Sequence, residues 1–229
     1  MNVLAIDTSN QVLGVAVTKE GQLAGELVTN IKKNHSIRLM PAIDQLMKEA
    51  GMKPAELDRI VVAKGPGSYT GVRIGLTTAK TMAWSLGIPV VGISSLEVVA
   101  RQGHFFDGYI CPFFDARRGL VFTGLYDASM DIVKEETNIP LDQWLESLKE
   151  LDRKILFLSQ DIDLHRASIE EALGEQAVFA DHASMNLPRP SMLIAAGEAK
   201  QPEDLHSFTP NYLRLAEAEA KWMEQHGKK

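Results

Sequence analysis

The segment KGPGSYTGVRIG, residues 64–75, contains the residue types that proteins use to hold a phosphate group. Gly65 and Gly67 follow a strand-like run and precede a helix-like run, so backbone N–H groups at a helix N-terminus could face an anion. A P-loop and a dinucleotide-binding loop both fail here, because Thr70 stands where each pattern requires a further glycine. Two interpretations stay open at comparable weight: an anion site beside a helix cap at Ser68 or Thr70, and a tight turn that needs glycine only for its backbone conformation.

Other reactive residue types are sparse and carry no catalytic spacing. Cys111 is the single cysteine, which excludes an internal disulfide and a cysteine-based zinc site, and we expect a buried, inert thiol. Asp115 with Arg117 and Arg118 could brace a turn, bind an anion or line a subunit contact, and the structural role is favoured. No arrangement of Ser, His and Asp or of Cys and His indicates a peptidase.

Composition limits the classes of function. The chain has 229 residues, 45% of them hydrophobic, which suffices for a bilobal unit or two small domains. Its net charge of −6 argues against autonomous nucleic-acid binding, because phosphate contacts require a basic face. No apolar run approaches the roughly 18 residues that cross a bilayer, and the start MNVLAIDTSN lacks the features of a signal peptide. We therefore expect a cytoplasmic protein without membrane contact.

Hydrophobic periodicity and turn residues predict the elements that position these residues. The first part follows the order βββαβαβ, with strands at 3–6, 12–17, 25–28, 59–63 and 89–93 and helices at 36–50 and 70–86. In the second part of the chain, the same signals predict strands at 109–114, 120–126 and 155–158 and helices at 141–149, 164–173 and 192–199. The segment AEAEAKWMEQHGKK, which has high helix propensity, follows them. Acidic runs such as Glu135-Glu136 are interpreted as solvated surface, and no repeat is found. A boundary near 101–109 predicts lobes at 1–103 and 104–229.

Small residues recur along the helix predicted at 70–86. Gly71, Gly75, Ala79 and Ala83 are spaced by four, so they form one stripe that allows another helix to approach closely. The partner of this stripe is either the apolar ridge of the helix at 36–50 or a second subunit, and both alternatives stay open. If a subunit packs there, Gly75→Leu should leave the monomer folded and weaken association.

Five segments together resemble the TsaB family, formerly called YeaZ: LAIDTSNQVLGVAV, NHSIRLMPAIDQLM, VVAKGPGSYTGVRIGLTTAKTMAWSLGIPVVGISSL, FFDARRGLVFTGLY and PNYLR. The similarity is dense over residues 1–126 and returns at 210–214, and the GPGSYTGVR stretch is its most specific part. The resemblance implies an α/β, actin-like or Hsp70-like ATPase fold in two lobes with a βββαβα core. It also implies a scaffold subunit of the bacterial complex that makes N6-threonylcarbamoyladenosine on tRNA.

The resemblance further implies the partners of such a subunit. They are a TsaD-like catalytic subunit, paired through the first-lobe helices, and a TsaE-like ATPase, with a homodimer when the chain is isolated and tRNA reached only through the complex. The residues expected at the partner interface are Leu39, Met40, Ile43, Met47, Gly71, Gly75, Ala79 and Ala83.

Departures from active members of this fold imply that the chain has no catalytic residue and no metal of its own. Active members have an acidic residue and a glycine in the hairpin that binds phosphate; here Asp7 is the acidic residue, but Ser9 stands in place of the glycine that lets phosphate approach. They also have a glycine-rich adenosine-binding motif in the second lobe, for which this chain offers only Gly197. A TsaD-like metal site needs two histidines four apart on a helix, whereas His35 is followed by Leu39.

The nucleotide that such a subunit could bind is ATP or ADP, and the expected place for it is the junction between subunits. The residues that the resemblance places near it are Asp7, Thr8, Ser9, Gly65, Gly67, Ser68, Tyr69 and Thr70. The alternative function is a stand-alone small ATPase or kinase of the actin-like fold, in which Asp7 would place Mg²⁺ and the glycine loop would hold phosphate.

Overall fold

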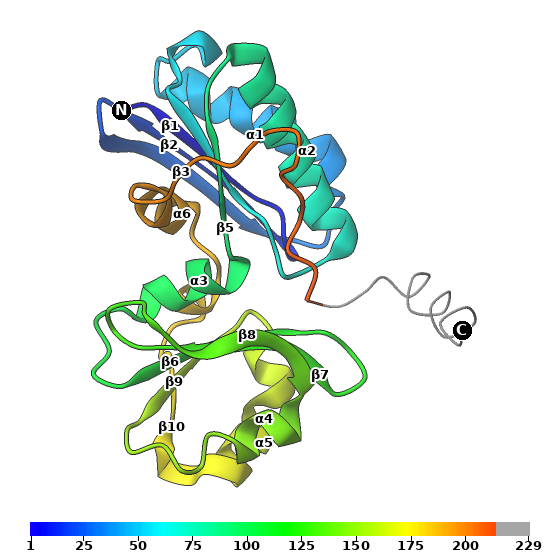
Figure 1. Cartoon of the computed structure of the whole chain (residues 1–229), viewed down its shortest axis with the longest axis vertical. Helices are drawn as coiled ribbons and strands as arrows, with labels where there is room; N and C mark the ends of the chain where they lie inside the picture. The colour runs from blue at the N-terminus through cyan, green and yellow to red at the C-terminus, as the bar shows by residue number, and fades with distance from the viewer. Residues whose placement is uncertain (214–229) are drawn as a thin grey trace, which may run out of the picture.

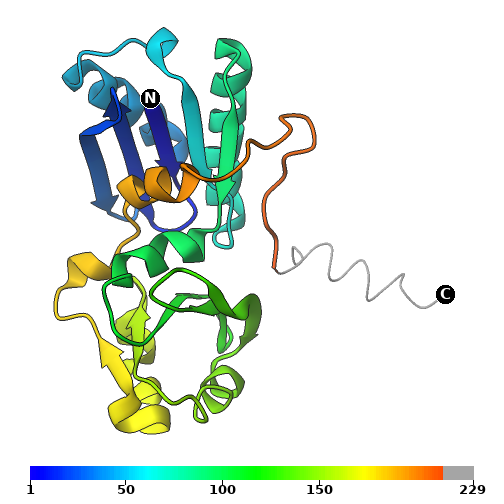
Figure 2. The same ribbon diagram turned by 60° about the vertical axis from the view of Figure 1, so that its left-hand side comes forward.

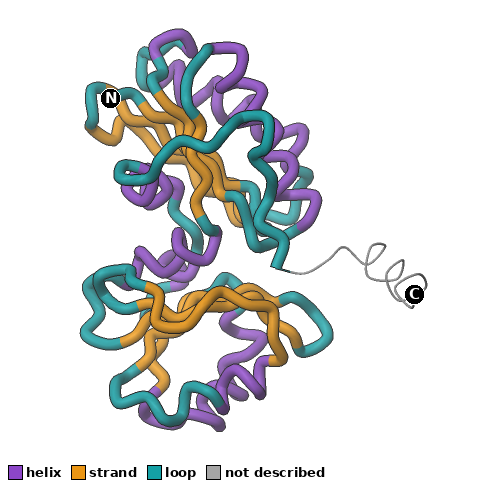
Figure 3. Tube along the Cα trace, in the orientation of Figure 1, coloured by secondary structure: helices purple, strands orange, loops and turns teal. Residues whose placement is uncertain are grey.

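The computed structural model describes residues 1–213. The chain forms two lobes, each built on a five-stranded mixed sheet with helices on its faces (Figure 1, Figure 3). The short helix α3 (Ser95–Ala100) lies between the lobes (Figure 1). The helical segment expected at the C-terminus lies outside the described residues.

The sheet of the first lobe has the strand order β3-β2-β1-β4-β5. Its first three strands form an antiparallel meander, and β4 and β5 add in parallel. Their bounds are β1 (Val3–Asp7), β2 (Val12–Lys19), β3 (Gln22–Asn30), β4 (Arg59–Ala63) and β5 (Val90–Ile93). Helices α1 (His35–Glu49) and α2 (Tyr69–Leu86) cover one face, and α6 (Pro190–Gly197) covers the other (Figure 1).

The sheet of the second lobe has the order β10-β9-β6-β7-β8. The strands are β6 (Tyr109–Asp115), β7 (Leu120–Tyr126), β8 (Ile132–Pro140), β9 (Ile155–Leu158) and β10 (Ala177–Phe179). Helices α4 (Leu141–Glu146) and α5 (Ile162–Leu173) pack on one face, and α3 packs on the other. Short 3-10 turns occupy Pro54–Glu56, Arg101–Gly103, Gly174–Gln176 and Ala183–Asn186.

The two sheets repeat one topology. In each, two antiparallel pairings join the first three strands. The fourth strand then pairs in parallel with the first, and the fifth pairs in parallel with the fourth. This duplication was not predicted, since no repeat is found in the sequence. Different apolar patterns can form the same strand order without shared residue identity. The repeat places Asp7 and Asp115 at equivalent strand ends, β1 and β6.

The small-residue stripe of α2 faces the interior of the first lobe and not a second subunit. Gly71, Gly75, Ala79 and Ala83 are all buried, and a Cβ on Gly75 would lie 2.5 Å from Thr8 Oγ1. The stripe therefore allows α2 to approach the end of β1, which corrects the predicted interface.

The α1 residues that we predicted for the same interface are also mostly internal. Leu39, Ile43 and Met47 are buried in the core that α1 and α2 share with the sheet. Met40, at 49% exposure, is the one member of the predicted interface set that faces solvent. The outer faces of the two helices, and not the predicted ridge and stripe, are the surfaces available to another molecule.

Most predicted elements occur within a few residues of their expected bounds. Helix α2 ends at Gly87, which adopts the left-handed conformation with φ of 67°, and α1 runs through Pro41. Strand β8 was missed because it is an edge strand with mixed polar residues, paired with β7 alone. Helix α3 and strand β10 were also missed, and both are short.

The chain returns to the first lobe after completing the second. Residues 203–213, which we call the C-terminal strap, run from the edge of the first sheet toward the glycine loop (Figure 2). Glu203 N donates to Val90 O at 2.9 Å, Asn211 N donates to Lys64 O at 2.7 Å, and Phe208 is buried in the first core. With α6 also on the first sheet, the predicted division at 103 and 104 does not describe the C-terminal part of the chain.

Candidate functional site

A cleft of about 720 Å³ lies where the two lobes and the C-terminal strap meet. Its walls are the residues after β1, the glycine loop, the turn after β6, the residues after β9 and the end of the strap. Of the predicted nucleotide-proximal residues, Gly67, Ser68, Tyr69 and Thr70 line the cleft. The other four, Asp7, Thr8, Ser9 and Gly65, do not line it and are buried.

Asp7 ends β1 in a fully enclosed position. Its Oδ1 accepts hydrogen bonds from Ser9 N at 2.8 Å and from Ser9 Oγ at 2.7 Å, while its buried Oδ2 has no hydrogen-bond partner. Burial raises the pKa of this carboxyl, although the two bonds from Ser9 and the nearby His35 oppose that shift. The carboxylate thus braces its own turn and is shielded from the cleft.

The glycine loop packs directly against this first hairpin. Ser68 N donates to Ser9 O at 2.6 Å, and a Cβ on Gly67 would overlap that same carbonyl oxygen. On the opposite side, a Cβ on Gly65 would lie 2.8 Å from Asn211 O of the strap. The two glycines therefore allow close backbone contact with the hairpin on one side and with the strap on the other, and both adopt positive φ, as the tight-turn interpretation holds.

Ser68 also begins helix α2, as predicted. Its Oγ accepts a hydrogen bond from Gly71 N at 3.3 Å. Thr8 Oγ1 donates to Gly71 O at 2.8 Å, so the hairpin and the first turn of α2 are joined by a buried side-chain bond. These contacts explain why this stretch combines glycine with small hydroxyl residues.

The turn after β6 forms the opposing wall of the cleft. Arg117 and Arg118 both adopt positive φ, 63° and 56°, in a turn held by Arg117 N donating to Asp115 Oδ2. Asp115 Oδ1 lies 3.1 Å from His165 Nε2, and Asp115 N donates to Asp161 Oδ2 at 3.0 Å. The favoured structural role of Asp115 agrees with these bonds, and Arg117 and Arg118 line the cleft as well.

Two tyrosines line the strap side of the cleft, and Arg73 contacts both of them. The rings of Tyr69 and Tyr212 stack with centroids 5.3 Å apart. The guanidinium carbon of Arg73 lies 3.9 Å from the Tyr69 centroid, and Arg73 Nε donates to the Tyr212 hydroxyl at 2.7 Å. Near the C-terminus, the sequence leads us to expect that Tyr212 and Arg214 anchor the tail and take no part in chemistry. Tyr212 does anchor the strap, but its pairing with Tyr69 could not be expected from residues so far apart in sequence. Arg214 lies outside the described residues.

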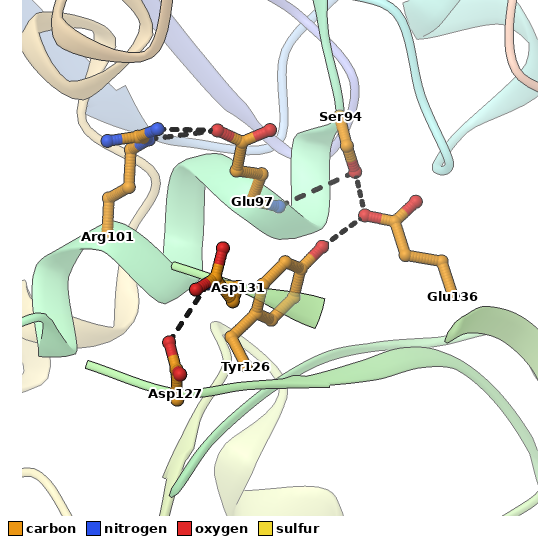
Figure 4. A network of polar contacts seen from close by, with 7 residues as sticks. All are labelled: Ser94, Glu97, Arg101, Tyr126, Asp127, Asp131 and Glu136. Atoms are coloured by element: carbon orange, nitrogen blue, oxygen red, sulfur yellow. Dashed lines mark hydrogen bonds and ion pairs between the residues drawn. The ribbon is translucent and has the colours of Figure 1, made fainter. Parts of the chain in front are cut away.

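A partly buried polar network at the lobe junction was not predicted at all. Glu136 Oε1 accepts hydrogen bonds from the hydroxyls of both Ser94 and Tyr126 (Figure 4). Nearby, Arg101 Nη2 and Glu97 Oε1 form an ion pair at 2.7 Å. Glu136 was taken for solvated surface because it lies in an acidic run, and that interpretation is wrong.

The ionisation of Glu136 should couple the stability of the fold to pH. Burial is the main cause that raises the pKa of this carboxyl; bonds from Ser94 and Tyr126 oppose it, and the charges of Glu97 and Glu135 add to it. A raised pKa in the folded state means that folding favours the protonated form, so this contribution is complete below the ordinary carboxyl pKa. It is lost as pH rises through the raised value.

Glu136→Gln removes this titration while keeping the shape of the side chain. We expect the free energy of unfolding of the parent protein, relative to Glu136→Gln, to fall as pH rises from about 4 to about 8. Urea unfolding at a series of pH values measures the difference. Glu171→Gln, at an exposed position on α5, is the charge-matched control. A difference between the parent and Glu136→Gln that is flat with pH would contradict the expectation.

The outer faces of α1 and α2 carry apolar side chains without cover. Ile37 is 71% exposed and Met40 49% exposed on α1, and Trp84 is 73% exposed on α2. Exposed large apolar residues on neighbouring helices are typical of protein contact surfaces. Within residues 1–213, no cluster of three or more His, Cys, Asp or Glu side chains is arranged to hold a metal ion. No helix among those residues combines the length and apolar character needed to cross a bilayer.

Comparison with known proteins shows similarity along nearly the whole chain. The family described as TsaD, tRNA N6-adenosine threonylcarbamoyltransferase, matches residues 22–222. The chain is 52% identical to the tRNA threonylcarbamoyladenosine biosynthesis protein TsaB of Bacillus subtilis, covering 98% of this chain and 99% of that protein. It is 29% identical to TsaB of Escherichia coli over 55% of each chain.

Solved structures agree with the sequence comparison. A Pseudomonas aeruginosa protein described as similar to peptidase YEAZ superposes with a TM-score of 0.77 at 25% identity, covering 93% of this chain and 99% of that one. The ethanolamine utilization protein EutJ of Carboxydothermus hydrogenoformans, at 12% identity and a TM-score of 0.53, covers 84% of this chain and 90% of that one and shares the fold alone. Together with the repeated sheet topology, these similarities confirm the predicted two-lobe, actin-like α/β fold.

Proposed function

Because this chain belongs to the TsaB family, within the wider group that the TsaD family describes, we propose that it is a non-catalytic subunit of the machinery that makes N6-threonylcarbamoyladenosine on tRNA. The observation that carries this proposal is the 52% identity to Bacillus subtilis TsaB over nearly the full length of both chains.

The geometry of the first hairpin supports a non-catalytic role. An ATPase of this fold needs space for phosphate between the first hairpin and the loop before α2. Here Ser68 N and Gly67 are packed against Ser9 O, and Asp7 Oδ1 accepts hydrogen bonds from Ser9 of its own turn. This close packing beside the enclosed Asp7 supports the proposal that the first hairpin does not hold a phosphate.

The alternative, a stand-alone ATPase or kinase, draws on one observation: Asp7 is buried with an unpartnered Oδ2. The two functions differ in ATP turnover by the isolated chain. We expect turnover by the purified chain to equal that of the Asp7→Asn variant, because Asp7 does not reach the cleft. Turnover that the parent shows and Asp7→Asn loses would establish the enzyme.

We propose that the outer faces of α1 and α2 pair with a TsaD-like catalytic subunit. Ile37, Met40 and Trp84 supply the apolar contacts, and the same faces form a homodimer when the chain is isolated. A TsaE-like ATPase completes the assembly. The net charge of −6 supports contact with tRNA only through the complex, in the cytoplasm and without a membrane.

We further propose that the cleft holds ATP or ADP when the catalytic subunit is paired, and that this chain holds no cofactor by itself. The stacked rings of Tyr69 and Tyr212 beside the cleft favour an aromatic base. Titration of fluorescent ADP into this chain, with and without the TsaD-like subunit, tests whether the nucleotide site depends on pairing. Equal affinity for ADP in both titrations would contradict the proposal that the site forms at the subunit junction.

A further inference from the structure

Helix α3 lies between the lobes and packs against both of them. Its side chains divide between two cores: Leu96 and Val99 pack with residues of the second sheet, whereas Val98 packs with α6 and the first sheet. Strand β5 of the first lobe leads into α3 through Ser94. A change in the angle between the lobes would therefore have to be accommodated around this residue.

Ser94 holds both the start of α3 and a side chain of the second lobe. Its Oγ accepts hydrogen bonds from Leu96 N at 3.1 Å and from Glu97 N at 3.4 Å, which caps the helix. The same hydroxyl donates to Glu136 Oε1, and the Tyr126 hydroxyl donates to that oxygen as well (Figure 4). One carboxylate oxygen thus joins the end of the first sheet to two strands of the second.

The second sheet is shaped to present this carboxylate. The pairing of β7 with β8 passes from Thr123 opposite Thr137 to Leu125 opposite Lys134, so β8 contains one extra residue at Glu135 and Glu136. Such a bulge redirects side chains that regular alternation would place elsewhere. Gly124 lies opposite, and a Cβ there would be 3.2 Å from Glu136 Cγ, so its absence leaves room for the side chain.

We propose that Ser94, Tyr126 and Glu136 form a latch that fixes the angle between the two lobes and thereby the width of the cleft. The latch lines a second cavity of about 500 Å³, which shares Asn211 and Leu213 of the strap with the cleft. Release of the latch therefore moves walls of both cavities. This inference concerns the isolated chain and does not depend on the proposed partner.

The charged groups around the latch are mostly paired with one another. Glu97 pairs with Arg101 on α3 and the turn after it, and Lys64 pairs with Glu203 of the strap at 3.1 Å. Glu135 of β8 and Lys200 also line this second cavity. Because the Glu136 bonds are donated by two neutral hydroxyls, removal of one hydroxyl weakens the latch without breaking an ion pair.

The latch can be tested by measuring a distance across the lobes with spin labels. Cysteines introduced for Thr77 on α2 and Glu171 on α5 occupy exposed positions in different lobes, and the native Cys111 is buried and will not react. The doubly labelled chain is diluted into an excess of unlabelled protein, so that a homodimer contributes only distances within one protomer. Double electron–electron resonance then gives the distribution of the distance between the two labels. We expect one narrow maximum for the parent, and a shifted or broadened distribution for Tyr126→Phe and for Glu136→Ala.

Controls separate release of the latch from unfolding. Tyr126→Phe keeps the ring in the core, so it decides the matter if Glu136→Ala fails to fold. Glu135→Gln changes a carboxylate on the same bulge that makes no bond to Ser94 in the described structure, and it should leave the distribution unchanged. A distribution in folded Tyr126→Phe identical to the parent, or a broad one in the parent itself, would overturn the proposal.

Discussion

The Gly75→Leu variant is expected to lose about 3 kcal/mol or more of its free energy of unfolding, because overpacking a tight core has costs of this size. The first atom of the new side chain would lie 2.5 Å from Thr8 Oγ1 and 3.7 Å from Ile6 Cγ2, and three further carbons would have to enter the same space. Thr8 cannot move freely, since its hydroxyl bonds Gly71 O. Urea unfolding followed by circular dichroism measures the loss.

This expectation reverses the one drawn from the sequence, in which the monomer stays folded and association weakens. Thr77→Leu is the matched control, because Thr77 lies on α2 two residues further on and is exposed. It adds a similar side chain without entering the core and should unfold like the parent. If Gly75→Leu were as stable as the parent, the contact between α2 and the end of β1 would be wrong.

The Trp84→Asp variant is expected to weaken pairing with the TsaD-like subunit by about 2 kcal/mol or more, roughly thirtyfold in Kd, which is the size of effect seen when an aromatic residue central to an interface is lost. Trp84 is 73% exposed in the isolated chain, so its replacement should not disturb the fold. A carboxylate in its place would also have to be desolvated on pairing. Isothermal titration calorimetry of the two purified subunits measures the affinity.

Met40→Asp makes the same test on the neighbouring helix α1 and should also weaken pairing with the TsaD-like subunit. Leu164→Asp is the control, since Leu164 is 69% exposed on α5 of the second lobe, away from α1 and α2. Parent affinity for Trp84→Asp and Met40→Asp together would show that the catalytic subunit binds elsewhere.

Local signals were sufficient for most of the fold. The glycine after helix α2, Gly87, and the apolar runs of β6 and β7 are signals carried by a few neighbouring residues. The corresponding elements lie close to where the sequence predicts them. Edge strand β8 was missed because none of its residues is fully buried, so its pattern resembles a solvated acidic segment. The duplicated topology was missed because it resides in strand order and not in residue identity.

The candidate site was predicted less completely, since it depends on residues that are distant in sequence. The glycine loop was identified, but its reason for glycine involves Ser9 and Asn211, which flank it from opposite ends of the chain. The small-residue stripe gave a correct inference of close packing and a wrong partner. Spacing shows that something approaches α2 closely, and it does not say whether that is a helix, a subunit or the end of a strand.

Reconstituted threonylcarbamoyl transfer to tRNA tests the central claim most directly. The TsaD-like subunit, the TsaE-like ATPase, ATP, a threonylcarbamoyl donor and tRNA are combined with this chain, without it, and with the Trp84→Asp variant, and modified adenosine is measured. We expect product only with the chain present, less with Trp84→Asp, and none from the chain alone. Equal product with and without the chain, or transfer by the chain alone, would contradict its assignment as a required, non-catalytic subunit.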